Sequence, residues 1–185
     1  MRLFRSRGGD DDLRAPRPRL VPALTLMRAG RYAEAEAEAR AVAADPEHEP
    51  LALAVAALSL GARGRHAEAL AQYDALLPVY GRVFGAEHPQ TLLLRSNRAQ
   101  TLVALGRHAE SETECAAVAR AAARVRGPER PRMEAAARNG QIYAVNAQGR
   151  HPEAERLARE ALAAHHAPDR ITLALRLGLA RSLNG

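Results

Sequence analysis

The sequence is poor in several residue types on which whole classes of protein depend. Its 185 residues include one cysteine, no tryptophan and no lysine, and aromatic side chains make up 3%. A single cysteine excludes a disulfide framework and a zinc site built from cysteines. No apolar run reaches about 18 residues, so the sequence predicts no membrane-spanning helix. The scarcity of aromatic and β-branched residues also disfavours a sheet protein.

Alanine, leucine, arginine and glutamate dominate what is present. These side chains lose little rotamer freedom in a helix, so the composition is typical of helical proteins. The length suits one domain or one array of small repeats, and it suffices to bury a core without disulfides or metals. We therefore predict an all-α protein.

The formal net charge is +6, and all 27 basic residues are arginines. Residues 1–19 hold six arginines and three aspartates, whereas the remainder has 21 arginines against 18 acidic residues, closely interspersed. That pattern is typical of solvated helix faces rather than of a nucleic-acid groove. Nucleic acid is therefore not the expected partner, although a contact made by the arginine-rich start remains an alternative.

The first 18 residues differ from the rest in composition. They lack the apolar stretch of a secretory signal, and Gly8, Gly9, Pro16 and Pro18 oppose regular structure. We predict a disordered Arg/Asp/Pro-rich tail over residues 1–18. The single cysteine and the lack of an export signal favour a cytoplasmic location.

The strongest signal is an internal repeat. The pattern Gly-Arg-Tyr/His-x-Glu starts at Gly30, Gly64, Gly106 and Gly149, with spacings of 34, 42 and 43 residues. Self-similarity at such a period is the signature of a repeat array. Each glycine is expected to end one helix with a positive φ. The fifth residue after each glycine is small, which lets paired helices approach closely; these residues are Ala35, Ala69, Ser111 and Ala154.

The pattern resembles a tetratricopeptide repeat array. A small residue stands seven positions before three of the turn glycines, and a large apolar residue stands four positions before all four. These are Ala23, Ala57 and Ala99, and Leu26, Leu60, Leu102 and Val145. Within Val83–Glu110, the pattern G-x-x-H-P-x-T-L is similar to the long repeats of kinesin light chains and bacterial relatives. In the fourth repeat, Ile142 departs from the pattern by occupying the small-residue position.

The resemblance implies a right-handed α-solenoid of about four helix-turn-helix repeats over residues 19–185, closed by a terminal capping helix. A proline-induced kink is expected at Pro78. The helices are predicted over residues 20–29, 32–44, 50–60, 66–83, 89–105, 108–126, 131–147, 152–165 and 169–183.

No catalytic constellation is apparent, so we expect neither enzymatic activity nor a cofactor. Cys115 occupies a repeat position that core residues fill, and it lacks an activating neighbour pattern. His165 and His166 could ligate a metal with Asp169, but a solvated helix end is the favoured interpretation, because adjacent residues do not share a helix face. No metal site is therefore predicted.

The resemblance also implies that the leading helix of each repeat lines a concave surface, which in this family binds extended peptides or helical segments. Asparagine and glutamine amides can hold a peptide backbone, and arginine can hold a carboxylate. The alternative is that these amides only cap or solvate helices. The candidate residues are Leu51, Val55 and Leu58 in an apolar half, and Asn97, Gln100, Asn139, Tyr143, Asn146 and Arg176 in a polar half.

The helix over Leu51–Leu60 is apolar nearly all round. Such a helix must be covered on every side, by its neighbours, by a partner or by the tail. The predicted function is a protein–protein interaction scaffold or adaptor that binds a protein or peptide partner in the groove. The alternative is a peptide-sensing regulatory module that acts through homodimerisation.

Overall fold

The computed structural model describes residues 18–45, 49–165 and 167–184. Throughout this part the regular structure is helical, without a strand, which confirms the all-α class. A short 3-10 helix over Pro18–Leu20 precedes α1 (Val21–Arg28), α2 (Tyr32–Val42), α3 (Glu49–Ala62), α4 (His66–Val83), α5 (Pro89–Ala104), α6 (His108–Ala122), α7 (Arg130–Ala147), α8 (His151–Ala164) and α9 (Arg170–Asn184). None of the described helices is both long enough and apolar enough to cross a membrane.

The predicted helices are confirmed in number and nearly in extent over the described residues. The largest difference is at α6, which ends at Ala122 rather than at residue 126. The helix α4 continues through Pro78 to Val83 as one element. The predicted disordered tail lies outside the described residues, apart from Pro18.

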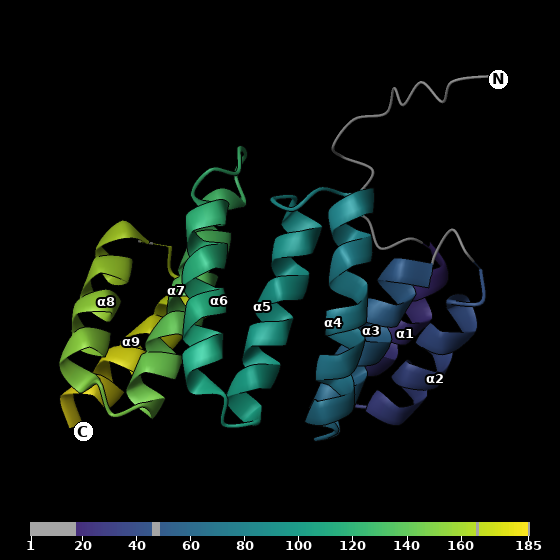
Figure 1. Cartoon of the computed structure of the whole chain (residues 1–185), viewed down its shortest axis with the longest axis horizontal. Coiled ribbons are helices and arrows are strands. Elements are labelled where there is room, and N and C mark those ends of the chain that lie inside the picture. Colours follow the sequence, from purple (N-terminus) through teal and green to yellow (C-terminus); the bar gives the residue numbers. More distant parts are fainter. Residues whose placement is uncertain (1–17, 46–48, 166, 185) are drawn as a thin grey trace.

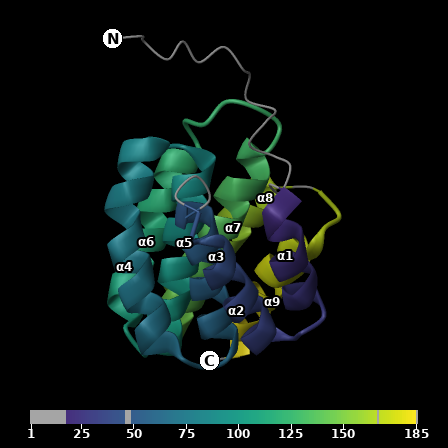
Figure 2. The same cartoon turned by 90° about the vertical axis from the view of Figure 1, so that its right-hand side faces the viewer.

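The helices form an α-solenoid, with successive helices packed side by side along the long axis of the molecule (Figure 1). The leading helices α1, α3, α5, α7 and α9 also contact one another in series. The trailing helices α2, α4, α6 and α8 contact one another far less over their described residues. The leading helices therefore approach each other more closely than the trailing helices do, and they form the inner side of the array. In the view along the array, α4 and α6 lie on the side opposite α1 and α9 (Figure 2).

The four repeat glycines make the turns that the pattern predicts. Gly30, Gly64, Gly106 and Gly149 have φ values of 74°, 78°, 75° and 73°. Only glycine adopts this region without strain from a Cβ atom. The arginine after each glycine bonds the glutamate three residues later, which lies in the first helical turn. These pairs are Arg31–Glu34, Arg65–Glu68, Arg107–Glu110 and Arg150–Glu153.

The burial of the small residues of the repeat confirms the predicted register. All seven are fully buried: Ala23, Ala35, Ala57, Ala69, Ala99, Ser111 and Ala154. Ser111 shows how a polar variant is accommodated, because its hydroxyl donates a 2.9 Å hydrogen bond to the carbonyl oxygen of Ala99. A buried hydroxyl with such a partner avoids the cost of an unpaired polar group.

The large residue at Ile142 in α7 is accommodated by a small residue in the next leading helix, α9. Ile142 is fully buried, and a Cβ atom placed on Gly178 of α9 would lie 2.9 Å from its Cγ2 atom. The volume added in α7 is therefore matched by volume removed from α9. Gly140 has the same relation to Cys115, since a Cβ atom there would lie 2.8 Å from the Cys115 sulfur.

Candidate protein-interaction surface

The apolar half of the predicted surface belongs largely to the core. No residue from 51 to 61 is exposed, so the neighbouring helices cover α3. Leu51 packs against the cluster that contains Tyr73 and Tyr80. Val55 packs against the cluster of Ala23, Ala39 and Ala56, while Leu58 is half-buried. These three side chains therefore offer little free apolar area to a partner.

Three amide side chains of the polar half have no hydrogen-bond partner among the described residues. Asn97 in α5 and Asn139 in α7 are half-buried, and Gln100 is exposed. None of the three side chains makes a hydrogen bond to another part of the described chain. Because each amide carries both donors and acceptors, these groups can pair with the backbone of a bound segment.

Tyr143 and Arg181 join the last two leading helices at the surface. The Tyr143 ring is exposed, and the guanidinium carbon of Arg181 lies 5.2 Å from its centroid. This arrangement is a cation–π contact between α7 and α9. Arg176 is exposed on α9 and makes no ion pair with any described residue.

Asn146 has a different position from the other predicted amides. Its Nδ2 donates to the carbonyl oxygen of Gly178 at 3.1 Å, and its Oδ1 accepts from the Ser182 hydroxyl at 3.1 Å. Its Oδ1 also lies 3.2 Å from Nδ1 of His151. Asn146 therefore fastens α9 to α7. The signal in the sequence is the i,i+4 spacing of Gly178 and Ser182, which places both on one face of α9.

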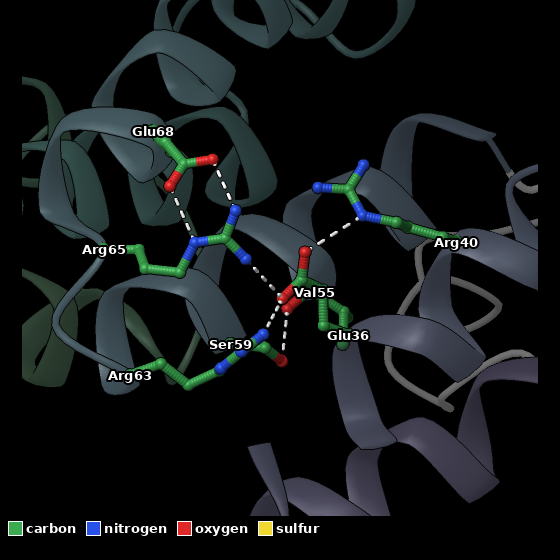
Figure 3. A network of polar contacts seen from close by, with 7 residues as sticks. All are labelled: Glu36, Arg40, Val55, Ser59, Arg63, Arg65 and Glu68. Carbon is green, nitrogen blue, oxygen red and sulfur yellow. Dashed lines mark hydrogen bonds and ion pairs between the residues drawn. The ribbon is translucent and has the colours of Figure 1, made fainter. Parts of the chain in front are cut away.

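A nearly buried carboxylate links the first two repeats, and the sequence analysis missed it (Figure 3). Glu36 is 7% exposed, and three arginines surround it. The distances to its carboxylate oxygens are 3.1 Å from Arg40 Nε, 2.5 Å from Arg63 Nη1 and 3.5 Å from Arg65 Nη1. Such a group needs these partners, because burying an unpaired charge is costly.

The same relation recurs between the third and fourth repeats. Glu112 accepts a 2.6 Å hydrogen bond from Arg150 and a 2.9 Å bond from Gln148. Glu36 and Glu112 both stand six residues after a turn glycine, whereas Arg65 and Arg150 directly follow the next one. That periodic pairing of acid and base was the available signal in the sequence.

The favoured interpretation of His165 as part of a solvated helix end is wrong. Its side chain is buried, and its Nε2 lies 3.2 Å from both carboxylate oxygens of Asp169. Asp169 also caps α9 by accepting from the backbone of Ile171 and Thr172. The Thr172 N–H, aided by His165, holds the pKa of Asp169 below its usual range. His165 and Asp169 are four residues apart, on either side of the break between α8 and α9.

Metal and thiol chemistry receive no support from the described residues. No three of their histidine, cysteine, aspartate or glutamate side chains are arranged to hold a metal ion; His166 is outside this set. Cys115 is buried, and burial raises the pKa of its thiol to about 11. A protonated thiol is a poor nucleophile, so Cys115 acts as a core residue.

Comparison with known proteins agrees with this architecture. Residues 50–113 match the family model of the tetratricopeptide repeat. The fold is similar to solved TPR-like repeats of a putative kinesin light chain from Podosopora anserina and of a variant of that protein. Each has a TM-score of 0.73 and 20% identity, over 90% of this chain and 84% of the other. No curated protein matches the chain.

The helical array and its surface thus define an α-solenoid of the kind that presents one helix of every pair on its inner side. Residues 50–113 are tetratricopeptide repeats by this match, and the fold of the chain is similar to the TPR-like repeats of a putative kinesin light chain. Tetratricopeptide repeats are in general scaffolds for protein–protein interaction.

Proposed function

We propose that this chain is a non-catalytic scaffold that binds a segment of a partner protein across its leading helices. The observation that supports this proposal is the pair of half-buried amides at Asn97 and Asn139. They lie on the successive leading helices α5 and α7, and neither has a hydrogen-bond partner among the described residues. A half-buried amide without a partner in the chain can form hydrogen bonds with a bound segment, and these bonds would favour binding.

The chemistry of these side chains suits an extended backbone better than a charged ligand. The amides of Asn97, Gln100 and Asn139 are neutral and offer paired donors and acceptors, as a peptide group does. Arg176, one leading helix further on, adds a charged contact to a carboxylate. Recognition by the neutral amides should therefore vary little with salt, whereas the contribution of Arg176 should shrink as salt rises.

The test is calorimetric affinity for a protein that co-purifies with the full chain. Replacing Asn97 and Asn139 together by alanine should leave the melting temperature unchanged and weaken binding by about 1–3 kcal/mol. Gln72→Ala is the matched control, because Gln72 is a half-buried amide on the trailing helix α4. If the double variant binds as tightly as the wild type, the amides are not the recognition surface.

A further inference from the structure

The last helix presents an apolar face that no described part of the chain covers. One face of α9 packs in the hydrophobic core, where Leu175 is fully buried and Ile171 and Leu179 pack on the same cluster. On the opposite side, Leu173 is 69% exposed and Leu177 is 55% exposed. These two leucines lie one helical turn apart, so their side chains form a continuous strip. Contiguous exposed apolar surface is a feature of contact sites on folded proteins.

The charge around these leucines is predominantly positive; the one carboxylate that borders the same depression as Leu173 is Asp169, which already contacts His165 and caps α9. The helix α9 carries Arg170, Arg176 and Arg181 and no acidic residue. None of these arginines forms an ion pair with a described residue. This contrasts with the turn arginines, each of which bonds a glutamate of its own repeat. On α7 the exposed Arg132 is also without an ion pair, and Glu134 is the one acidic residue of that helix.

Contacts across the seam between α7 and α9 show that these residues form one surface. Arg132, Arg170 and Leu173 line the same shallow depression near the start of both helices. Near the other end, Arg181 lies over the ring of Tyr143. Eleven residues separate the two ends on each helix, which corresponds to about 16 Å. We name this surface the terminal strip; it consists of Arg132, Tyr143, Arg170, Leu173, Leu177 and Arg181.

We propose that the terminal strip docks an acidic amphipathic helix of a partner protein. Leu173 and Leu177 are about 6 Å apart along α9, the spacing at which the apolar residues of a second helix interdigitate. Acidic residues toward both ends of that helix would meet the arginines and form charge-assisted bonds. This inference goes beyond the proposed function, because it concerns the exposed side of α9 and its seam with α7. Tyr143 lies one helical turn after Asn139, so the strip adjoins the amides of α7.

Charge selects this partner over a second copy of the chain. A symmetric contact through α9 would bring Arg170, Arg176 and Arg181 toward the same arginines of the other copy, with no acid on either helix. Like charges facing each other across an interface cost several kcal/mol. A phosphate backbone would satisfy the arginines, but it would leave Leu173 and Leu177 uncovered.

The first experiment is selection from a phage-displayed library of random peptides about sixteen residues long, with the full chain as bait. Enriched peptides should carry net negative charge and apolar residues three or four positions apart. Synthetic copies of the most enriched peptides should gain helicity on binding, as circular dichroism would show. Enrichment without an acidic bias, or without the helical spacing, would overturn the proposal.

Variants then locate the binding surface with the same synthetic peptides. Leu173→Ser with Leu177→Ser should weaken peptide affinity by about tenfold or more, because two leucine contacts are lost. The melting temperature should not change, since both side chains are exposed. Val83→Ser is the matched control, because Val83 is an exposed apolar residue of α4. Equal affinity of the double leucine variant and the wild type would contradict the proposal.

A second pair of variants tests the charge. Arg170→Ser with Arg181→Ser should weaken binding and flatten its salt dependence. Arg82→Ser with Arg120→Ser is the control, since these exposed arginines also make no ion pair with any described residue. The Asn97 and Asn139 double variant should retain full peptide affinity, which separates the strip from the amides.

Two further outcomes would assign the strip to another occupant and refute the proposal. The wild type, but not the double leucine variant, could sediment with vesicles of phosphatidylcholine and phosphatidylserine, which would make the strip a membrane contact. Alternatively, sedimentation could show a dimer that the double leucine variant loses. The expected result is a monomer that does not bind these vesicles.

Discussion

Glu36 and Arg63 bond across the first repeat junction, where the Glu36 carboxylate lies 2.5 Å from Arg63 Nη1. The arginine precedes the turn glycine of the second repeat, and the glutamate lies in the trailing helix of the first. The pair therefore couples the first two repeats, together with the longer contact of 3.5 Å from Arg65 Nη1 to the same carboxylate. Its two members differ in solvation, since the side chain of Glu36 is 10% exposed and that of Arg63 is 35% exposed.

Glu36→Ala should lower the free energy of unfolding by about 1–3 kcal/mol, because three guanidinium groups lose a shared acceptor at the junction. Urea denaturation measures this change. Glu34→Ala is the control, since Glu34 is exposed and bonds Arg31 of its own repeat. We expect its unfolding midpoint to match the wild type. Equal midpoints for Glu36→Ala and Glu34→Ala would show that the junction contact does not stabilise the array.

Gly140→Ala should destabilise the protein by about 1–3 kcal/mol, because the new methyl group would collide with the Cys115 sulfur. Adding Cys115→Ala should recover most of the loss. Gly81→Ala should instead stabilise the protein by about 0.5–1 kcal/mol, since it lies within α4 with no atom near the added Cβ. Thermal melts distinguish these cases, and a neutral Gly140→Ala would mean that α6 and α7 are further apart than described.

Cys115 should resist alkylation in the folded chain. With its pKa raised to about 11 by burial, about one thiol in a thousand is ionised at pH 8. Mass spectrometry after iodoacetamide treatment at pH 8 should find slow labelling in buffer and rapid labelling in urea. Rapid labelling of the folded chain would contradict the buried position of the thiol.

Ala154→Arg should cost about 2–5 kcal/mol, because it overfills a close contact and buries a charge. Ala154 is fully buried in α8. Ala37→Arg introduces the same side chain at an exposed position of α2, and its melting temperature should stay near that of the wild type. If both variants melt alike, the helix register of the fourth repeat is different from the one described.

The features predicted from the sequence are those encoded within one repeat. The positive φ of Gly64 and the burial of Ala69 follow from residues that are neighbours along the chain, so a repeated pattern reveals them. The helix bounds follow for the same reason, because the turn glycines and prolines mark helix ends locally.

The features missed depend on residues that are far apart in sequence. Whether Asn146 faces a partner or Gly178 is decided by how α9 packs on α7, across 32 residues. His165 is the exception, because its partner Asp169 is only four residues away. At the candidate surface, the sequence predicted which residues lie on leading helices, but the free area at Leu51 and Val55 depends on the packing of neighbouring helices.

The arginine–glutamate pairs at the four turns have a consequence for long-range electrostatics. Each turn arginine is neutralised by a glutamate within its own repeat, so the turn edge presents alternating charges whose fields cancel beyond about a Debye length of 8–10 Å. Helices α7 and α9 together carry six arginines that form no ion pair with a described residue, and one glutamate, so uncancelled positive charge is dense at that end. An anionic molecule diffusing toward the array is drawn to that end first, and its encounter rate should fall as ionic strength rises.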